Sequence, residues 1–371
     1  MNIMILSQML TEGGAERVAS LWISGFCAEG HCVSVVMNTN RINPITYSIP
    51  ENVRIFNLCK KKGVATRVLK KIGIELKPIK KLRKIILETK PDVIIGLLHP
   101  YASWALEASR GLNIPIINTE HNCFERPAYA PLDKKTIRNK FESNKLFNHV
   151  TVLTKRDYDL LKDKLNNVSV LPNPLSFDPY YGENLRKNVI LVSARLSVWH
   201  CKGLDLLIKA WGKISKKFPD WKIEIAGRND DKSLVLLQSM AEDCGVDDSQ
   251  LSFCGFCRDI LPLYRQAKIF VMSSRYEGFG MSLIEAMSQG CACITCDFLG
   301  RQREIIQDDS QGIVCPIDDV DALAKALEKM ISDDAYRMMC AKNAIERSKY
   351  YSLSNIMEKW NQIFKDLNLT E

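Results

Sequence analysis

The amino-acid sequence predicts an α/β protein with two domains, each built around a parallel β-sheet. Its 371 residues are more than one hydrophobic core usually accommodates. Short apolar runs, typical of buried strands, alternate with helix-forming segments along the chain, as parallel sheets require. Pro172-Asn173-Pro174 interrupts this alternation, so we place the domain boundary there, with one domain over 1–172 and the other over 173–351.

Composition and the first residues argue against an exported or membrane-spanning protein. The chain is 46% apolar and 25% charged, as ordinary soluble globular proteins are. Residues 1–7 lack the basic and long apolar regions of a secretory signal. No apolar run approaches the length needed to span a bilayer.

Thirteen cysteines are scattered along the chain, which favours a reducing compartment. Cys254 and Cys257 form a C-x-x-C pair, and Cys291, Cys293 and Cys296 follow it. A zinc site needs a second, properly spaced ligand pair on loops, whereas these cysteines interrupt apolar, strand-like runs. We therefore expect them to be small buried side chains, and we expect no metal site.

Positive charge is concentrated in the first domain. Residues 1–172 hold 26 Lys and Arg against 15 Asp and Glu, a balance of +11; the rest hold 25 against 28, or −3, which gives the net charge of +8. The basic residues within 60–90, interleaved with apolar ones, include Lys80, Lys81, Arg83 and Lys84. This pattern fits an anionic membrane surface, or a solvated helix whose apolar face packs on the core. No nucleic-acid-binding module accompanies it, so nucleic acid is not an expected partner.

The first domain is predicted to contain seven strands. They are expected at 3–7, 32–37, 53–58, 93–97, 115–118, 150–153 and 168–171. Helices are expected at 78–89, 132–147 and 155–165. The first of these ends at Lys90-Pro91, because the residue before proline disfavours helix. Gly13-Gly14 opens a further helix and offers backbone N–H groups to an anion, a weak indication on its own.

Two histidines follow neighbouring predicted strands. His99 comes after 93–97, and His121, followed by Asn122, comes after 115–118. The carboxyl ends of parallel strands share the edge at which open α/β sheets bind ligands. Histidine titrates near neutrality and can donate to a sugar hydroxyl or a phosphate. The alternative for either histidine is a packed loop residue.

The second domain is predicted to repeat the alternation. Strands are expected at 189–193, 221–226, 251–253, 269–272 and 291–295, and helices at 203–217, 233–244, 261–267, 319–332, 334–349 and 352–367. Arg195 and Lys202 lie between the first strand and the first helix. Two cations in this place would neutralise a diphosphate and stabilise it as a leaving group, unless they are merely surface charges.

Residues 273–286 combine a strand end, a loop with Gly278 and Gly280, and the start of a helix. Such a loop exposes the N–H groups of Phe279-Gly280-Met281 at the positive end of the helix dipole, where phosphate oxygens bind. Glu277 and Glu285 frame the loop and suit neutral hydrogen-bond donors such as sugar hydroxyls. This is the outline of a nucleotide-sugar site; the alternative is two ordinary helix carboxylates.

Glu277 to Glu285 resembles the E-x7-E signature of family 4 retaining glycosyltransferases, including the Gly-Phe-Gly and the Glu285-Ala286 pair. The resemblance runs nearly end to end. It implies the GT-B fold, with two facing Rossmann-like domains and a C-terminal helix, about 352–371, that crosses back to the first domain. It also implies transfer from a nucleotide-diphosphate sugar with retention of configuration, by a front-face reaction and without a metal or other cofactor.

The resemblance assigns the donor residues one by one. Arg195, Lys202 and the Phe279-Gly280-Met281 backbone would hold the α- and β-phosphates. Glu285 would hold the ribose, and Glu277 would hold hydroxyls of the transferred sugar. The cations and the helix dipole would replace a divalent ion on the leaving group.

The first domain supplies the acceptor side in this family. Gly13-Gly14 would lie across the cleft from the donor diphosphate, His99 would be the catalytic-site histidine, and His121 with Asn122 would face the acceptor. The loop at 300–306 departs from the family's neutral pattern, because it carries Arg301 and Arg303. Its contacts with the sugar are therefore not assigned.

We thus expect a hexosyltransferase, with a UDP-sugar (GalNAc, GlcNAc, glucose or galactose) as the favoured donor. The expected acceptor is a glycan, linked to polyprenyl diphosphate, in bacterial polysaccharide or O-antigen assembly. The expected location is cytoplasmic, on the inner face of the cytoplasmic membrane. The alternatives are a GDP-mannose-dependent mannosyltransferase, a nucleotide-sugar epimerase or hydrolase of the same fold, and a non-catalytic sugar-nucleotide sensor.

Overall fold

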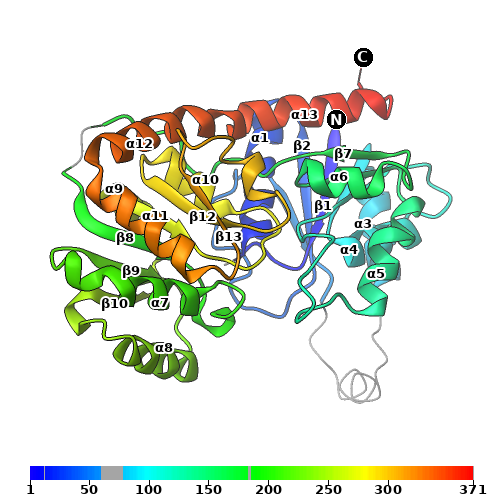
Figure 1. The fold of residues 1–371 in the computed structure, drawn as a ribbon. Coiled ribbons are helices and arrows are strands. Elements are labelled where there is room, and N and C mark those ends of the chain that lie inside the picture. Colours follow the sequence, from blue (N-terminus) through cyan, green and yellow to red (C-terminus); the bar gives the residue numbers. More distant parts are fainter. Residues whose placement is uncertain (12, 60–77, 183–184, 371) are drawn as a thin grey trace. The chain divides into compact units, whose positions relative to one another are not determined.

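The computed structural model describes residues 1–11, 13–59, 78–182 and 185–370. It divides into two compact units (Figure 1). Unit 1 comprises Met1–Glu125, Pro131–Ser176 and Leu353–Glu371, and unit 2 comprises Arg126–Ala130 and Phe177–Ser352. Most of the basic stretch predicted at 60–90, namely 60–77, lies outside the described residues.

The described part of unit 1 holds a seven-stranded sheet in the order β3-β2-β1-β4-β5-β6-β7. Every neighbouring pair is parallel. The strands are β1 (Asn2–Ser7), β2 (Cys32–Met37), β3 (Arg54–Asn57), β4 (Val93–Leu97), β5 (Ile116–Thr119), β6 (His149–Val152) and β7 (Val168–Val170). Because each strand returns through a crossover, all carboxyl ends lie at one edge, which confirms the predicted parallel arrangement.

The helices of unit 1 pack their apolar faces on this sheet and on one another. They are α1 (Gly14–Ala28), α3 (Ile79–Thr89), α4 (His99–Ala108), α5 (Lys134–Phe141), α6 (Lys155–Leu161) and α13 (Leu353–Asp366). α13 returns from the end of the chain to pack on α1 (Figure 1), where the Trp22 and Trp360 rings meet edge to face with centroids 5.1 Å apart. The predicted return of the C-terminal helix is thereby confirmed.

Two helices differ from the sequence-based expectation. Residues 132–147, predicted as one helix, form α5, which Asp133 caps, and then the 3₁₀-helix Ser143–Leu146. α4 was not predicted, and His99, which was placed only after the strand 93–97, is its first residue. Pro100 at the next position is compatible with a first helical turn, because its missing N–H would have no partner there.

Unit 2 contains, among its described residues, a six-stranded parallel sheet in the order β10-β9-β8-β11-β12-β13. The strands are β8 (Lys187–Ser193), β9 (Lys222–Ala226), β10 (Leu251–Gly255), β11 (Ala267–Met272), β12 (Ala292–Asp297) and β13 (Ile313–Pro316). The helices are α7 (Leu204–Ile214), α8 (Asp231–Asp243), α9 (Leu261–Gln266), α10 (Met281–Ser288), α11 (Val320–Ser332) and α12 (Asp334–Ser348). None of the described helices in either unit is long and apolar enough to cross a membrane.

The cysteines follow the prediction only in part. Cys291, Cys293 and Cys296 are free and buried at or within β12, which has a neighbouring strand on both sides, as expected. Cys254 is exposed and Cys257 is half-buried, so the expectation that they are buried was wrong. The physical reason is that β10 is an edge strand of the sheet, where side chains are covered from fewer sides.

Candidate active site

The stretch 273–286 forms the strand end, loop and helix that the sequence predicts. β11 ends at Met272 and α10 begins at Met281, with Gly280 as its N-cap. Gly280 has φ +116°, a conformation that favours glycine, and no side chain caps the helix. The first N–H groups of α10 therefore lie at a helix end with no internal acceptor, which suits an anion.

Lys202 and Glu277, both predicted site residues, are brought together in unit 2. Lys202 Nζ lies 2.6 Å from Glu277 Oε1, and Ser274 Oγ donates to the same oxygen at 2.7 Å. Both charged side chains are about one-fifth exposed, at 24% and 17%. The pair therefore faces solvent while remaining partly shielded, so its attraction is stronger than that of a surface pair.

The backbone places Lys202 against the loop. Ser273 Oγ donates to the Lys202 carbonyl oxygen at 3.0 Å. Gly203 has φ +61°, and a Cβ there would lie 2.0 Å from the Ser273 carbonyl oxygen. Any other residue at 203 would therefore push the start of α7 away from the loop and separate Lys202 from Glu277.

Arg275 is a buried part of this site that sequence reasoning missed. Its guanidinium donates to Asp205 Oδ1 at 2.7 Å and Oδ2 at 2.8 Å, and its Nε donates to Asp318 Oδ1 at 2.6 Å. These hydrogen bonds raise the pKa of Arg275, outweighing desolvation. The network ties the loop to the first turn of α7. No local pattern could reveal it, because Asp205 lies 70 residues away in the chain.

Arg195 and Glu285 lie in contrasting surroundings. Arg195 follows β8 and is exposed. Glu285 is only 6% exposed and accepts a hydrogen bond from the buried Tyr264 hydroxyl at 3.0 Å. Desolvation and the Glu285 charge raise the pKa of Tyr264 well above its ordinary value, so Tyr264 remains a donor. The proposed phosphate role of Arg195 and ribose role of Glu285 stay predictions.

A short segment, Arg126–Ala130, also belongs to unit 2. The Arg126 guanidinium lies over the Tyr276 ring, 5.3 Å from its centroid. The Tyr129 ring meets His200 edge to face at 5.1 Å, and burial raises the pKa of Tyr129 to about 12. Sequence reasoning missed this segment, because nothing in its composition links it to loops far along the chain.

In unit 1, both histidines follow strands that pair side by side, since Leu97 of β4 is in register with Thr119 of β5. His121 Nε2 lies 3.0 Å from Thr119 Oγ1, and its ring lies 5.6 Å from that of Trp22. Burial lowers the pKa of His121 to about 4. Desolvation also lowers the pKa of His99, although the Glu120 charge acts in the opposite direction. Both rings are therefore neutral at neutral pH.

The remaining predicted residues of unit 1 are placed as follows. Gly13 is the N-cap of α1, without a side-chain cap, and Gly14 is its first residue. Asn122 is exposed, and its carbonyl oxygen accepts from Lys140 Nζ at 3.0 Å. Among the described residues of either unit, no group of three or more His, Cys, Asp or Glu is arranged to hold a metal ion.

The basic helix α3 uses part of its charge inside unit 1. Lys81 Nζ donates to the Asn57 carbonyl oxygen at 2.6 Å, and Arg83 Nη1 donates to the carbonyl oxygens of Ala108 and Arg110 at 2.8 and 2.9 Å. Three apolar residues of the helix, Leu82, Ile85 and Ile86, are buried in the core, whereas Leu87 is 53% exposed. The exposed charges of α3 include Lys80 and Lys84.

Curated relatives of known activity match nearly the whole chain. It is 27% identical over 99% of both chains to GalNAc-α-(1→4)-GalNAc-α-(1→3)-diNAcBac-PP-undecaprenol α-1,4-N-acetyl-D-galactosaminyltransferase of Campylobacter jejuni. It is 23% identical to the N-acetylgalactosamine-N,N'-diacetylbacillosaminyl-diphospho-undecaprenol 4-α-N-acetylgalactosaminyltransferase of that organism, over 92% of this chain and 93% of the relative.

Solved structures share the fold. Sucrose-phosphate synthase of Thermosynechococcus elongatus superposes with a TM-score of 0.81 at 17% identity, covering 99% of this chain and 98% of its own. HepE of Anabaena, in complex with UDP and glucose, gives a TM-score of 0.77 at 17% identity and covers 99% and 100%.

Two family models match the chain in succession. The model described as Glycosyltransferase Family 4 matches residues 12–178, and the one described as Glycosyl transferases group 1 matches residues 177–347. Together with the GT-B fold of the solved structures, these matches show that the chain belongs to the family 4 type of glycosyltransferases.

Proposed function

We propose that this protein is a retaining hexosyltransferase of bacterial glycan assembly, with a UDP-sugar as donor and a polyprenyl-diphosphate-linked glycan as acceptor. The observation that carries the proposal is the Lys202–Glu277 pair beside the uncapped N-terminus of α10. Both Campylobacter relatives are named for transfer of N-acetylgalactosamine to an undecaprenyl-diphosphate-linked glycan. UDP-GalNAc is therefore the first donor to test.

On this proposal, Lys202 leaves Glu277 and binds the donor diphosphate. Its diphosphate oxygens accept from the α10 N–H groups, from Arg195 and from Lys202, which leaves Glu277 to accept from hydroxyls of the transferred sugar. Glu285, held by Tyr264 at the buried side of α10, accepts from the ribose. The cations and the helix dipole then stabilise the negative charge that develops on the departing diphosphate.

The geometry favours a front-face reaction over a double displacement. A double displacement needs a carboxylate that attacks the sugar, whereas on this proposal Glu277 accepts from sugar hydroxyls and from Ser274, and Glu285 is buried against Tyr264. The bond from sugar to diphosphate breaks, the acceptor oxygen bonds the same face, and the leaving phosphate oxygen takes the acceptor proton. Neutral His99 and His121 in unit 1 are suited to hydrogen-bond neutral sugar hydroxyls on the acceptor side.

A donor panel tests the proposal directly. The protein is incubated with UDP- and GDP-sugars and a prenyl-diphosphate-linked GalNAc acceptor, and nucleotide release and product are followed. UDP release with an α-linked product supports it. GDP release from GDP-mannose alone points to the mannosyltransferase, and nucleotide-sugar turnover without acceptor points to the epimerase or hydrolase.

Activity is expected to survive exhaustive chelation. Lys202, Arg195 and the α10 N-terminus carry the leaving charge on this proposal, so a divalent ion has no role to fill. The measurement is the transfer rate in EDTA after passage over a chelating resin, compared with the same enzyme in magnesium or manganese. Loss of turnover in chelator, restored by either ion, would contradict the expectation.

Peripheral contact with an anionic membrane, on its cytoplasmic face, is proposed to rest mainly on charge. Leu82, Ile85 and Ile86 of α3 are buried, so the helix offers mainly its exposed lysines to lipid headgroups, each contributing about 1 kcal/mol near the surface. Changing Lys80 and Lys84 to Glu is expected to reduce sedimentation with anionic vesicles at low salt. Lys81 and Arg83 are left intact, because they hold backbone carbonyl groups.

In the matched control, two exposed lysines of unit 2, Lys209 and Lys232, are changed to Glu in the same way. Thermal melts verify that both variants are folded. If wild-type protein does not sediment with anionic vesicles, or if both variants lose vesicle binding equally, α3 is not the membrane contact.

A further inference from the structure

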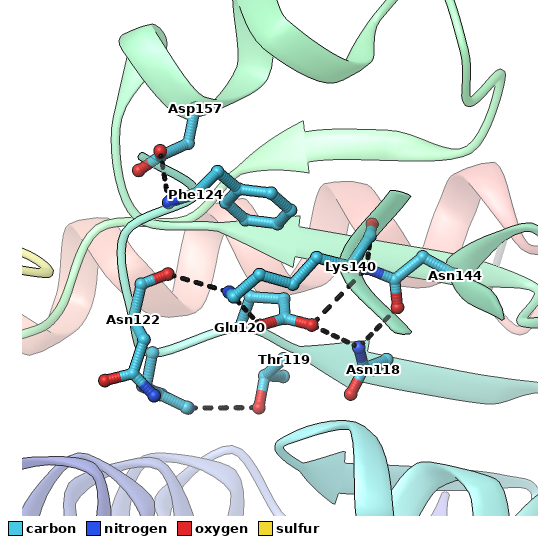
Figure 2. A network of polar contacts seen from close by, with 9 residues as sticks. Asn118, Thr119, Glu120, Asn122, Phe124, Lys140, Asn144 and Asp157 are labelled. Atoms are coloured by element: carbon cyan, nitrogen blue, oxygen red, sulfur yellow. Dashed lines mark hydrogen bonds and ion pairs between the residues drawn. The ribbon is translucent and has the colours of Figure 1, made fainter. Parts of the chain in front are cut away.

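A buried polar cluster lies at the carboxyl end of β5 in unit 1 (Figure 2). Lys140 Nζ lies 2.7 Å from Glu120 Oε2, and both side chains are at most 5% exposed. Asn118 Nδ2 and Asn144 Nδ2 both donate to Glu120 Oε1, at 3.2 and 3.3 Å. Desolvation acts to raise the pKa of Glu120, but the Lys140 charge and these hydrogen bonds hold it below its ordinary value. The cluster thus contains a charged carboxylate and a charged ammonium.

Lys140 holds the loop 120–124 at three successive points. At its start Lys140 pairs with Glu120, and in its middle it donates to the Asn122 carbonyl oxygen at 3.0 Å. At its end the ammonium lies over the Phe124 ring, 3.9 Å from the centroid. Figure 2 shows this side chain reaching from α5 across the loop. His121 lies between the first two contacts in the sequence.

The lysine itself is held in place from α5. Asn144 Nδ2 donates to the Lys140 carbonyl oxygen at 3.0 Å, and Asn118 Nδ2 donates to Asn144 Oδ1 at 2.8 Å. These hydrogen bonds link α5, the 3₁₀-helix Ser143–Leu146 and β5 around the Lys140 ammonium. A buried ion pair adds little net stability over apolar residues of the same shape, so stability alone does not account for this arrangement.

We propose that Lys140 is a positioning residue of the acceptor side, which fixes the loop 120–124 and through it the His121 ring and the Asn122 side chain. This inference rests on the proposed function, which places those two residues beside the acceptor. Lys140 acts through the loop and need not touch the substrate. The design is pre-organisation: ordering the loop before binding reduces the entropy lost when the acceptor binds.

The test separates positioning from stability with a double variant. Lys140→Met leaves Glu120 buried without its cation and is expected to lower the melting temperature, on the order of 10 °C. In Glu120→Gln/Lys140→Met both charges are gone, the amide oxygen of the introduced glutamine still accepts from both asparagines, and the melting temperature returns toward wild type. The donor to the Asn122 carbonyl oxygen is still missing.

In the double variant, amide exchange over residues 120–124 is expected to be at least about tenfold faster than in wild type. The pKa of His121, followed by NMR, is expected to rise from about 4 toward the ordinary histidine value, because relief of desolvation, the largest cause of the lowering, outweighs loss of the opposing Glu120 charge. The KM for a prenyl-diphosphate-linked GalNAc acceptor is expected to rise about tenfold, with kcat changed less than threefold. Lys134→Met, on the exposed side of α5, is the matched control and leaves all three readouts unchanged.

Loop exchange and His121 titration equal to wild type in the double variant would overturn the proposal, whatever the transfer assay shows. So would an acceptor KM that recovers together with the melting temperature, because a purely structural lysine predicts that recovery. Failure of the proposed function gives a different result. Wild-type protein would then transfer no sugar to the acceptor, while amide exchange over residues 120–124 would still be faster in the double variant.

Discussion

Arg275→Met is expected to lower the free energy of unfolding of unit 2 by about 3 to 5 kcal/mol. The substitution leaves the Asp205 carboxylate, 7% exposed, without the guanidinium that occupies both its oxygens. Differential scanning calorimetry measures the effect, as a melting temperature lower by on the order of 10 °C. Donor binding is expected to weaken as well, because the same guanidinium ties the loop 273–281 to α7.

Asp205→Asn offers an independent test of the same network, because it removes the opposite charge and leaves Arg275 with an amide. Lys217→Met is the control, since its ion pair with Glu328 is 60% and 41% exposed and contributes at most about 1 kcal/mol. If both network variants melt within about 2 °C of wild type, roughly half a kcal/mol, the loop is held by other contacts.

The parallel sheets and the loop 273–281 were predictable because each depends on a pattern within a few residues. Apolar runs mark buried strands, and glycines between a strand and a helix start predict a loop with exposed N–H groups, although phosphate binding there stays a prediction. The same reasoning placed Lys202 and Glu277 in one site, although it did not predict that they form an ion pair.

The contacts that build the site could not be predicted in this way. Arg275 and Asp205, and Lys140 and Glu120, are joined by packing between elements, and a single sequence carries no record of which elements meet. Lys81 shows the reverse error. It belongs to a basic, solvent-facing pattern, yet its ammonium holds a backbone carbonyl oxygen of a neighbouring strand. The pattern of charges along the sequence shows where basic residues are concentrated. Only the fold shows which of them form hydrogen bonds within the protein.

Lys202→Ala is expected to lower kcat/KM for transfer by about 10²- to 10³-fold, equivalent to roughly 3 to 4 kcal/mol of transition-state stabilisation. The loss has two sources to separate, because the variant removes a cation from the diphosphate and also leaves the Glu277 carboxylate without its partner at 2.6 Å. An unpaired carboxylate would repel the donor and raise its KM, whereas a missing cation would slow departure of the diphosphate and lower kcat.

Lys202→Ala/Glu277→Gln distinguishes these sources. If repulsion by Glu277 dominates, the double variant recovers donor KM and most of the rate; if the cation dominates, as we expect, kcat stays low in both variants. Lys213→Ala in α7, the helix that follows Lys202 in the chain, is the control, since it removes only an ion pair whose side chains are 51% and 70% exposed. A Lys202→Ala enzyme within about threefold of wild type would remove Lys202 from the leaving-group site. The charge on the departing diphosphate would then rest on Arg195 and on the N-terminus of α10.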